Sequence, residues 1–287
     1  LSPLFYIVFA LLCVLCVSAV KKNTNYTCII TADDACSGSS FFTRYDPMSF
    51  SDLQAVSSYD TVVNVPMLGV RDTADTESDL APEFEFIKED PRTRSMLITR
   101  RCIENRIDGL ARQIAKDYHD TRQIDMLVVL TGAFMFAADL CRDIYKHRRL
   151  DARVHMIKTS VYDQTIKDTH EKYRAVQLEL APKQIEGRHI LLIEDIADQG
   201  FTLTWLKDYL LNERDVSSIR ICSLIYKELD HPTDEVRKLR DNLDMDYIGF
   251  VVPDVWVAGY GVDAAQEFRN MPYIVWANEN YYLGKKS

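Results

Sequence analysis

Short apolar runs alternate with helical segments from about residue 95 onward, and this alternation constrains the fold most strongly. Residues 126–130 (MLVVL) and 190–193 (ILLI) have the length of a strand and are apolar on both faces. Such runs are typical of a parallel sheet that helices cover on each side. The sequence therefore predicts an α/β domain with a parallel-sheet core.

The remaining elements follow from periodicity. Ile103, Ile107, Leu110 and Ile114 recur at helical spacing, which predicts one apolar helix face. Helices are expected over residues 98–118, 134–145 and 202–211. Strands are expected over residues 126–130, 154–158, 175–180, 188–193, 219–226 and 247–252, and a long polar loop over 160–173. In such sheets ligands bind beyond the carboxyl ends of the strands, which directs attention to the segments after residues 130, 193, 226 and 252.

The amino-acid composition excludes some classes of function. The 287 residues are 47% apolar and 27% charged, as in globular proteins, and the formal net charge is −9. An acidic chain of this kind is a poor duplex-DNA binder, because binding to phosphates favours a basic surface, so we expect no nucleic-acid partner. No G-x-G-x-x-G or P-loop follows a strand.

The first part of the chain differs from the rest. Residues 1–20 carry no charge and are followed by Lys21 and Lys22, so residues 1–22 are expected to be a signal peptide or single anchor, with a non-native leader as the alternative. Membrane contact is expected only through this leader, if it is retained. Residues 23–94 are expected to be a linker or extension of uncertain order, and residues 95–287 to form the α/β domain.

The sharpest local signal follows the strand that ends at Ile193. Two adjacent carboxylates, Glu194 and Asp195, precede a turn with Asp198 and Gly200, after which a helix begins. Adjacent carboxylates can hold vicinal hydroxyls or a hydrated divalent cation, and a glycine turn that opens a helix presents N–H groups to a phosphate. Asp198 could accept a proton. The alternative is an ordinary strand-to-helix turn in which Asp198 is the N-cap.

The segment resembles the phosphoribosyl-diphosphate (PRPP) motif of type I phosphoribosyltransferases, E-D-x-x-D-[ST]-G-x-T. Three further features resemble the hypoxanthine-guanine branch of that family, over about residues 95–280. They are the loop 130–133 (LTGA), Lys227 at the end of a strand, and residues 252–263 (VPDVWVAGYGVD), with Glu267-Phe268-Arg269 after them. The resemblance implies the family's parallel-sheet core with a small hood, and a non-proline cis peptide in the loop.

The resemblance implies transfer of a phosphoribosyl group from PRPP to N9 of hypoxanthine or guanine, with pyrophosphate released. Asp198 would be catalytic and take the purine N7 proton. Glu194 and Asp195 would hold the ribose hydroxyls, directly or through Mg²⁺, and the stretch Asp198, Gln199, Gly200, Phe201 and Thr202 would cradle the 5′-phosphate. Thr131, Gly132 and Arg269 would contact pyrophosphate.

For the purine, the resemblance implies that Lys227 donates to O6, Trp256 stacks on the ring and the Val257 backbone contacts its edge. Asp263 would bind a second Mg²⁺ near the purine site. Without this context, Lys227 is a surface lysine and Trp256 a core aromatic residue. The polar stretch 160–173 corresponds to the family's mobile lid, and Tyr162 matches its tyrosine.

Three departures from the family pattern stand out. Gln199 replaces the hydroxyl residue after the catalytic aspartate, Val161 replaces the serine before the lid tyrosine, and residues 1–94 exceed what the family needs. The alternative function is therefore a catalytically weakened, nucleotide-binding regulatory relative. The resemblance further implies a cytoplasmic homo-oligomer, a dimer or tetramer, although the leader leaves a secretory or membrane-anchored location open.

Overall fold

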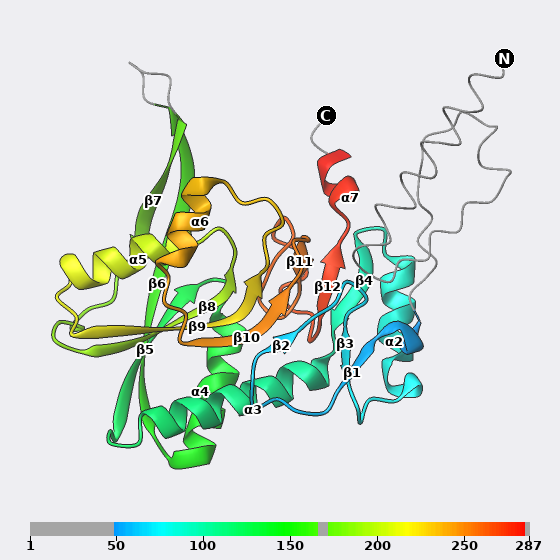
Figure 1. Ribbon diagram of the computed structural model, residues 1–287, viewed down its shortest axis with the longest axis horizontal. Coiled ribbons are helices and arrows are strands. Elements are labelled where there is room, and N and C mark those ends of the chain that lie inside the picture. Colours follow the sequence, from blue (N-terminus) through cyan, green and yellow to red (C-terminus); the bar gives the residue numbers. More distant parts are fainter. Residues whose placement is uncertain (1–48, 166–171, 285–287) are drawn as a thin grey trace, which may run out of the picture. The chain divides into compact units, whose positions relative to one another are not determined.

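The computed structural model describes residues 49–165 and 172–284 (Figure 1). The predicted leader and residues 23–48 of the predicted linker lie outside these residues. The described residues belong to one compact unit. Its main sheet contains seven strands, in spatial order β2 (Val63–Asn64), β10 (Tyr247–Val252), β9 (Ser218–Lys227), β8 (His189–Ala197), β5 (Gln123–Leu130), β6 (Asp151–Thr165) and β7 (Lys172–Leu180).

Neighbouring strands of this sheet run parallel from β2 to β6, and only β6 and β7 pair antiparallel. Alternate residues of β5 belong to different cores. Met126 and Val128 lie in one apolar cluster, whereas Leu127 and Val129 lie in a second. Successive side chains of a strand point to opposite faces, so the sheet is buried on both sides. The predicted parallel sheet is confirmed.

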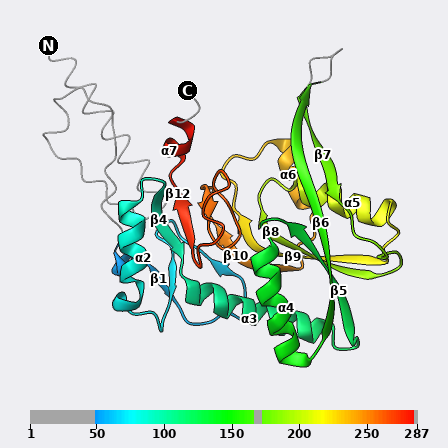
Figure 2. The same cartoon turned by 180° about the vertical axis from the view of Figure 1, so that it is seen from behind.

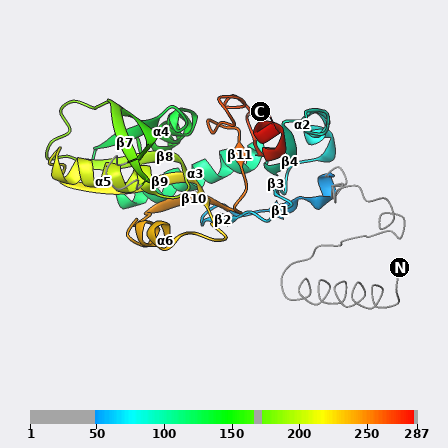
Figure 3. The same cartoon turned by 90° about the horizontal axis from the view of Figure 1, so that it is seen from above.

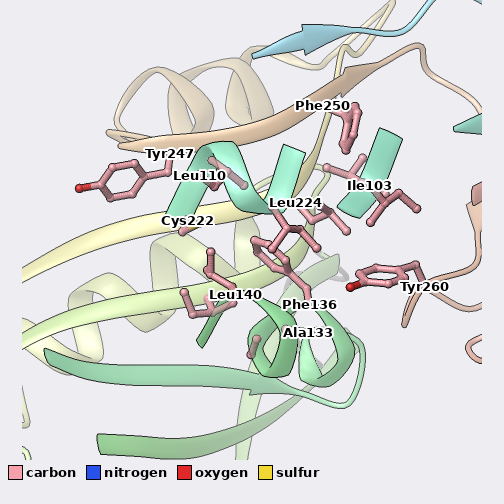
Figure 4. Close-up of a cluster of buried hydrophobic side chains, with 14 of the residues drawn as sticks. Ile103, Leu110, Ala133, Phe136, Leu140, Cys222, Leu224, Tyr247, Phe250 and Tyr260 are labelled. Atoms are coloured by element: carbon pink, nitrogen blue, oxygen red, sulfur yellow. The ribbon is translucent and has the colours of Figure 1, made fainter. Parts of the chain in front are cut away.

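Helices cover both faces of the main sheet. Helices α3 (Arg100–Asp117) and α4 (Phe134–Arg148) contribute to the first cluster, and α5 (Phe201–Asn212) contributes to the second. Figure 4 shows Ile103 of α3 and Phe136 of α4 gathered around Leu224 of β9. Helix α6 (Asp234–Asp241) lies on the side of β9 opposite α4 (Figure 3). The three helices predicted from the sequence are therefore present.

The structure corrects the prediction of a long loop over residues 160–173. Strand β6 continues to Thr165, and β7 begins at Lys172, with Tyr162 paired to Ala175. The two strands form a projecting hairpin (Figure 2). The reason is backbone pairing: a polar hairpin needs no apolar period to form its ladder of hydrogen bonds. Residues 166–171 lie outside the described residues.

A second, five-stranded sheet contains β1 (Gln54–Val56), β3 (Val70–Asp72), β4 (Thr93–Ile98), β12 (Ile274–Ala277) and β11 (Val257–Ala258), in that order. A short 3-10 helix, η1 (Phe50–Asp52), precedes it, and α2 (Glu77–Glu89) and α7 (Glu279–Leu283) accompany it. Residues 49–94, whose order the sequence left open, thus supply three strands and a helix. One of these strands, β2, pairs with β10 of the main sheet.

Candidate active site

The acidic pair lies near the carboxyl end of β8, in the middle of the main sheet. Glu194 is 6% exposed and Asp195 is 9% exposed. Strand β8 continues to Ala197, four residues beyond the expected end, so both acids belong to the strand itself. Burial and the neighbouring Asp195 carboxylate raise the pKa of Glu194, and burial raises the pKa of Asp195. Two buried acids side by side are costly as anions unless a cation or hydroxyl donors accompany them.

The turn after β8 forms the entrance to helix α5. Gly200 is the N-cap, with a φ of 87°, and no side chain caps the helix. That φ lies in the left-handed region that glycine adopts at little cost. The ordinary alternative for Asp198, capping of α5, is therefore wrong. The Asp198 side chain is directed to Lys227 instead.

A cavity of about 580 Å³ opens between the acidic pair and this turn. Its size is within the range of small-molecule sites. Its walls come from the end of β5, from β6 and from a continuous stretch after Ile193. The lining residues are Val129, Leu130, Thr159 and residues 194–203. The five residues predicted to cradle a phosphate, 198–202, all line it.

The loop after β5 packs directly against the acidic pair. The peptide bond between Leu130 and Thr131 is cis, as the resemblance implies. A Cβ on Gly132 would lie 1.7 Å from Oδ2 of Asp195, and a Cβ on Gly261 would lie 2.1 Å from the Gly132 carbonyl oxygen. Only glycine permits these approaches. Three segments distant in sequence therefore meet at Gly132, which is buried, whereas Thr131 is exposed.

Lys227 ends strand β9, one strand away from the acidic pair. Its side chain is only 13% exposed, so the interpretation as a surface lysine is wrong. The ammonium Nζ lies 3.5 Å from Oδ2 of Asp198 and 3.8 Å from Oδ1 of Asp254. Lys227 is in register with Val252 of β10. The segment after Val252 therefore starts beside the lysine, as sequence order alone could not show.

The other residues predicted to bind the purine lie further along the segment after Val252. Val257 belongs to β11, which pairs with β12. The ring of Trp256 lies 5.0 Å from that of Tyr282, at a tilted angle, and its backbone N–H donates to Glu279. Trp256 thus packs against α7, and its meeting with Asp198 at one ligand stays a prediction. Asp254, two residues before Trp256, does lie beside Lys227.

Asp263 and Arg269, expected to bind metal and pyrophosphate respectively, contact each other. Nη2 of Arg269 lies 2.6 Å from Oδ1 of Asp263, and Nη1 donates to the Gly261 carbonyl at 2.7 Å. Burial raises the pKa of Asp195, and the charge of Arg269 opposes that effect. Tyr162 lies in β6, but its side chain lies outside the described residues, so its place in a lid stays a prediction.

Sequence reasoning missed one residue at this edge of the sheet. Arg240 of α6 donates to the backbone carbonyl oxygens of both Asp198 and Lys227. It stands in a polar stretch thirteen residues after Lys227, and no motif marks it. Only the packing of α6 against the strand end reveals the contact.

Comparison with known proteins agrees with this geometry. Residues 96–265 match the phosphoribosyl transferase domain family. The chain belongs to the phosphoribosyltransferase family. Within this family it is similar to the hypoxanthine phosphoribosyltransferase of Haemophilus influenzae, with 37% identity over 182 residues, which are 62% of this chain and 92% of the relative. It is 35% identical to the Escherichia coli K12 hypoxanthine phosphoribosyltransferase over 184 residues, 63% of this chain and 94% of the relative.

Solved structures of the family share the fold of this phosphoribosyltransferase. The hypoxanthine phosphoribosyltransferase of Trypanosoma cruzi, solved as a mutant in complex with the product IMP, has a TM-score of 0.58 and 28% identity. The match covers 69% of this chain and 97% of that structure. The Staphylococcus aureus hypoxanthine phosphoribosyltransferase gives a TM-score of 0.55 at 29% identity, covering 67% and 95%. The predicted type I fold is confirmed.

Over residues 49–165 and 172–284, none of the helices is both long and apolar enough to cross a bilayer. Over the same ranges, no cluster of three or more His, Cys, Asp or Glu side chains is arranged to hold a metal ion.

Proposed function

We propose that this protein is a purine salvage enzyme that transfers the phosphoribosyl group of PRPP to N9 of hypoxanthine or guanine. N9 attacks C1′ of the ribose, the bond from C1′ to the pyrophosphate oxygen breaks, and pyrophosphate leaves with the electron pair. The products are IMP or GMP. The main support is the convergence of Asp195 with Gly132, and of Asp198 with Lys227, at one edge of the sheet. The names of the relatives favour an enzyme over the regulatory alternative.

We propose that PRPP occupies the cavity beside β8. Glu194 and Asp195 hold the ribose hydroxyls, since ionised carboxylates are strong hydrogen-bond acceptors. The turn contributes backbone N–H groups of Gln199, Gly200 and Phe201 and the hydroxyl of Thr202 to the 5′-phosphate, at the positive end of helix α5. Thr131, Gly132 and Arg269 are proposed to contact pyrophosphate, which places the leaving group next to Asp195.

The purine is proposed to bind between the turn and the segment after β10. Lys227 donates to O6, and Asp198 accepts the proton of N7, which makes N9 more nucleophilic. O6 and N7 lie on the same edge of a 6-oxopurine. The 3.5 Å between the lysine and aspartate side chains therefore suits one ligand edge. Adenine would present an amino group to the lysine ammonium, a donor facing a donor. Trp256 is proposed to stack on the ring and the Val257 backbone to contact its edge.

Magnesium fits the donor set of this site. Mg²⁺ prefers oxygen ligands and is commonly held by one or two carboxylates together with substrate phosphates. Glu194 and Asp195 supply such carboxylates at the wall of the cavity. Asp263 is proposed to hold a second ion, which requires its pair with Arg269 to open. When bound, magnesium neutralises diphosphate charge.

The assay that tests this function is the formation of IMP from hypoxanthine and PRPP. We expect the Asp198→Asn variant to lose roughly 10²- to 10⁴-fold in kcat, the usual contribution of a general base. Asp208→Asn is a matched control, because Asp208 is exposed on α5. If the wild type is as inert as Asp198→Asn but still binds IMP in a calorimetric titration, the regulatory alternative replaces the enzyme. Light scattering on the full chain tests the expected homo-oligomer.

A further inference from the structure

Helix α6 carries an arginine that reaches both proposed purine-edge residues through their backbones. Nη1 of Arg240 donates to the Asp198 carbonyl oxygen, and Nη2 donates to the Lys227 carbonyl oxygen at 2.7 Å. The two acceptors stand 29 residues apart in sequence and on different elements, the turn after β8 and the end of β9. One guanidinium therefore joins the turn after β8 to the end of β9, directly beyond Ala197 and Tyr226, the last pair of residues in the ladder between these strands.

The rest of Arg240 is held as firmly as its donors. The guanidinium carbon lies 4.0 Å from the centre of the Tyr226 ring, a distance suited to a cation–π contact. Its Cγ lies 3.5 Å from the position a Cβ would take on Gly200. Helix α6 is in turn capped by the Thr233 side chain and anchored by Val236, which is 6% exposed. The arginine thus has little freedom to leave the two carbonyls.

The two carbonyls that Arg240 binds belong to Asp198 and Lys227, whose side chains lie close together. The Lys227 ammonium lies between two carboxylates, 3.5 Å from Asp198 and 3.8 Å from Asp254. A lysine side chain has four rotatable bonds, so its head group can shift between such partners if its backbone moves. Fixing the carbonyls of Asp198 and Lys227 to one rigid planar group keeps the separation of their side chains constant.

We infer that Arg240 is a positioning residue for 6-oxopurine recognition, which fixes the distance between the group that reads O6 and the group that accepts the N7 proton. This inference rests on the proposed function. Arginine is required because its planar fork donates two bonds in a fixed geometry, whereas a lysine ammonium acts as a single point. Arg240 touches neither substrate in this assignment and acts only through Asp198 and Lys227.

The test compares Arg240→Ala and Arg240→Lys with Arg237→Ala in the full-length chain. Arg237 lies on the same helix, is 60% exposed and pairs only weakly with Asp234 at 3.3 Å. We expect both Arg240 variants to lose roughly 10- to 100-fold in kcat/KM for hypoxanthine, because displacements near 1 Å at a reacting edge have effects of this size. KM for hypoxanthine should rise more than KM for PRPP. Arg237→Ala should behave as the wild type.

Chemical rescue distinguishes a positioning role of Arg240 from a role in stability alone. Millimolar guanidinium or methylguanidinium, far below denaturing concentrations, should restore part of the activity of Arg240→Ala and none of that of Arg240→Lys. If Arg240→Ala does not fold, Arg240→Lys, which keeps the charge, decides alone. An Arg240→Lys enzyme as active as Arg237→Ala overturns the inference. So does an activity loss that merely follows the folded fraction and that guanidinium does not restore. A wild type without IMP formation instead refutes the proposed function, because Arg237→Ala is then inert as well.

Discussion

Gly132 is the residue at which a single added methyl group should separate activity from folding. An ideal Cβ at this position lies 1.7 Å from Oδ2 and 2.5 Å from Cγ of Asp195. Real Cβ contacts are not shorter than 3.0 Å, so in Gly132→Ala the two groups must separate by at least 3.0 − 1.7 = 1.3 Å. Asp195 is 9% exposed and follows a second buried acid, so the carboxylate cannot yield without leaving its place in the cavity wall.

A displacement of this size has a calculable effect on catalysis. Misplacing a positioning group by about 1 Å reduces rates on the order of 100-fold, which corresponds to about 2.7 kcal/mol of transition-state stabilisation. Overpacking a buried site costs about 1–3 kcal/mol of folding free energy. For a chain of this length each kcal/mol lowers Tm by roughly 2–4 °C. Gly132→Ala should therefore remain folded near 25 °C while losing most of its activity.

The assay measures kcat and KM for PRPP and hypoxanthine beside a thermal melt. The matched control is Gly284→Ala, because a Cβ there meets nothing within 4 Å. We expect KM for PRPP to rise in Gly132→Ala, since Asp195 is proposed to bind the ribose hydroxyls, and both constants to stay unchanged in Gly284→Ala. A Gly132→Ala protein that turns over PRPP as the wild type does would show that Asp195 is not held where the reasoning requires.

Two further predictions concern stability. Arg106 is 1% exposed and donates to the carbonyls of Tyr59, Ile248 and Gly249, at 2.6, 2.7 and 3.0 Å. Arg106→Met should lower the free energy of unfolding in urea by about 3 kcal/mol, because the buried carbonyls lose their donors. An unchanged urea midpoint would contradict this prediction. Burial raises the pKa of Asp125, but hydrogen bonds from Arg153 and His155 outweigh it and leave the pKa below its ordinary value. A carboxyl group whose pKa is lower in the folded state than in the unfolded state stabilises the fold above about pH 4. This stabilisation is lost as the pH falls through the folded-state pKa. The stability gap between wild type and Asp125→Asn should therefore narrow below about pH 4 in urea titrations, and a gap that widens there would reverse the sign.

The local pattern of the chain was sufficient for much of the fold. Ile103, Ile107, Leu110 and Ile114 are all at most 1% exposed, as their helical spacing predicted. The buried strands were found because a segment covered on both faces must be apolar throughout. The adjacent acids and the glycine turn can be recognised in the sequence because consecutive residues form them. Each of these inferences depends on neighbours within a few positions.

The same reasoning failed where pairing partners are distant. The sequence predicts a loop where β6 and β7 form a polar hairpin, because the backbone hydrogen bonds that pair two strands leave no periodic signal in a polar sequence. The sequence leaves the order of residues 54–72 open, whereas their three short strands belong to both sheets. Short edge strands depend on the sheet beside them for their stability rather than on their own composition.

The candidate site divides in the same way. The sequence by itself determined the class of fold, the acidic pair, the turn behind it and the identity of the lysine at the strand end. Only the tertiary structure decided that Asp195 lies against Gly132, that the half-buried Lys227 lies beside Asp198 and that Arg240 binds both backbones. The physical reason is that side-chain chemistry is a property of single residues. Close approach, by contrast, is set by the register of neighbouring strands and the packing of helices, which many distant residues fix together.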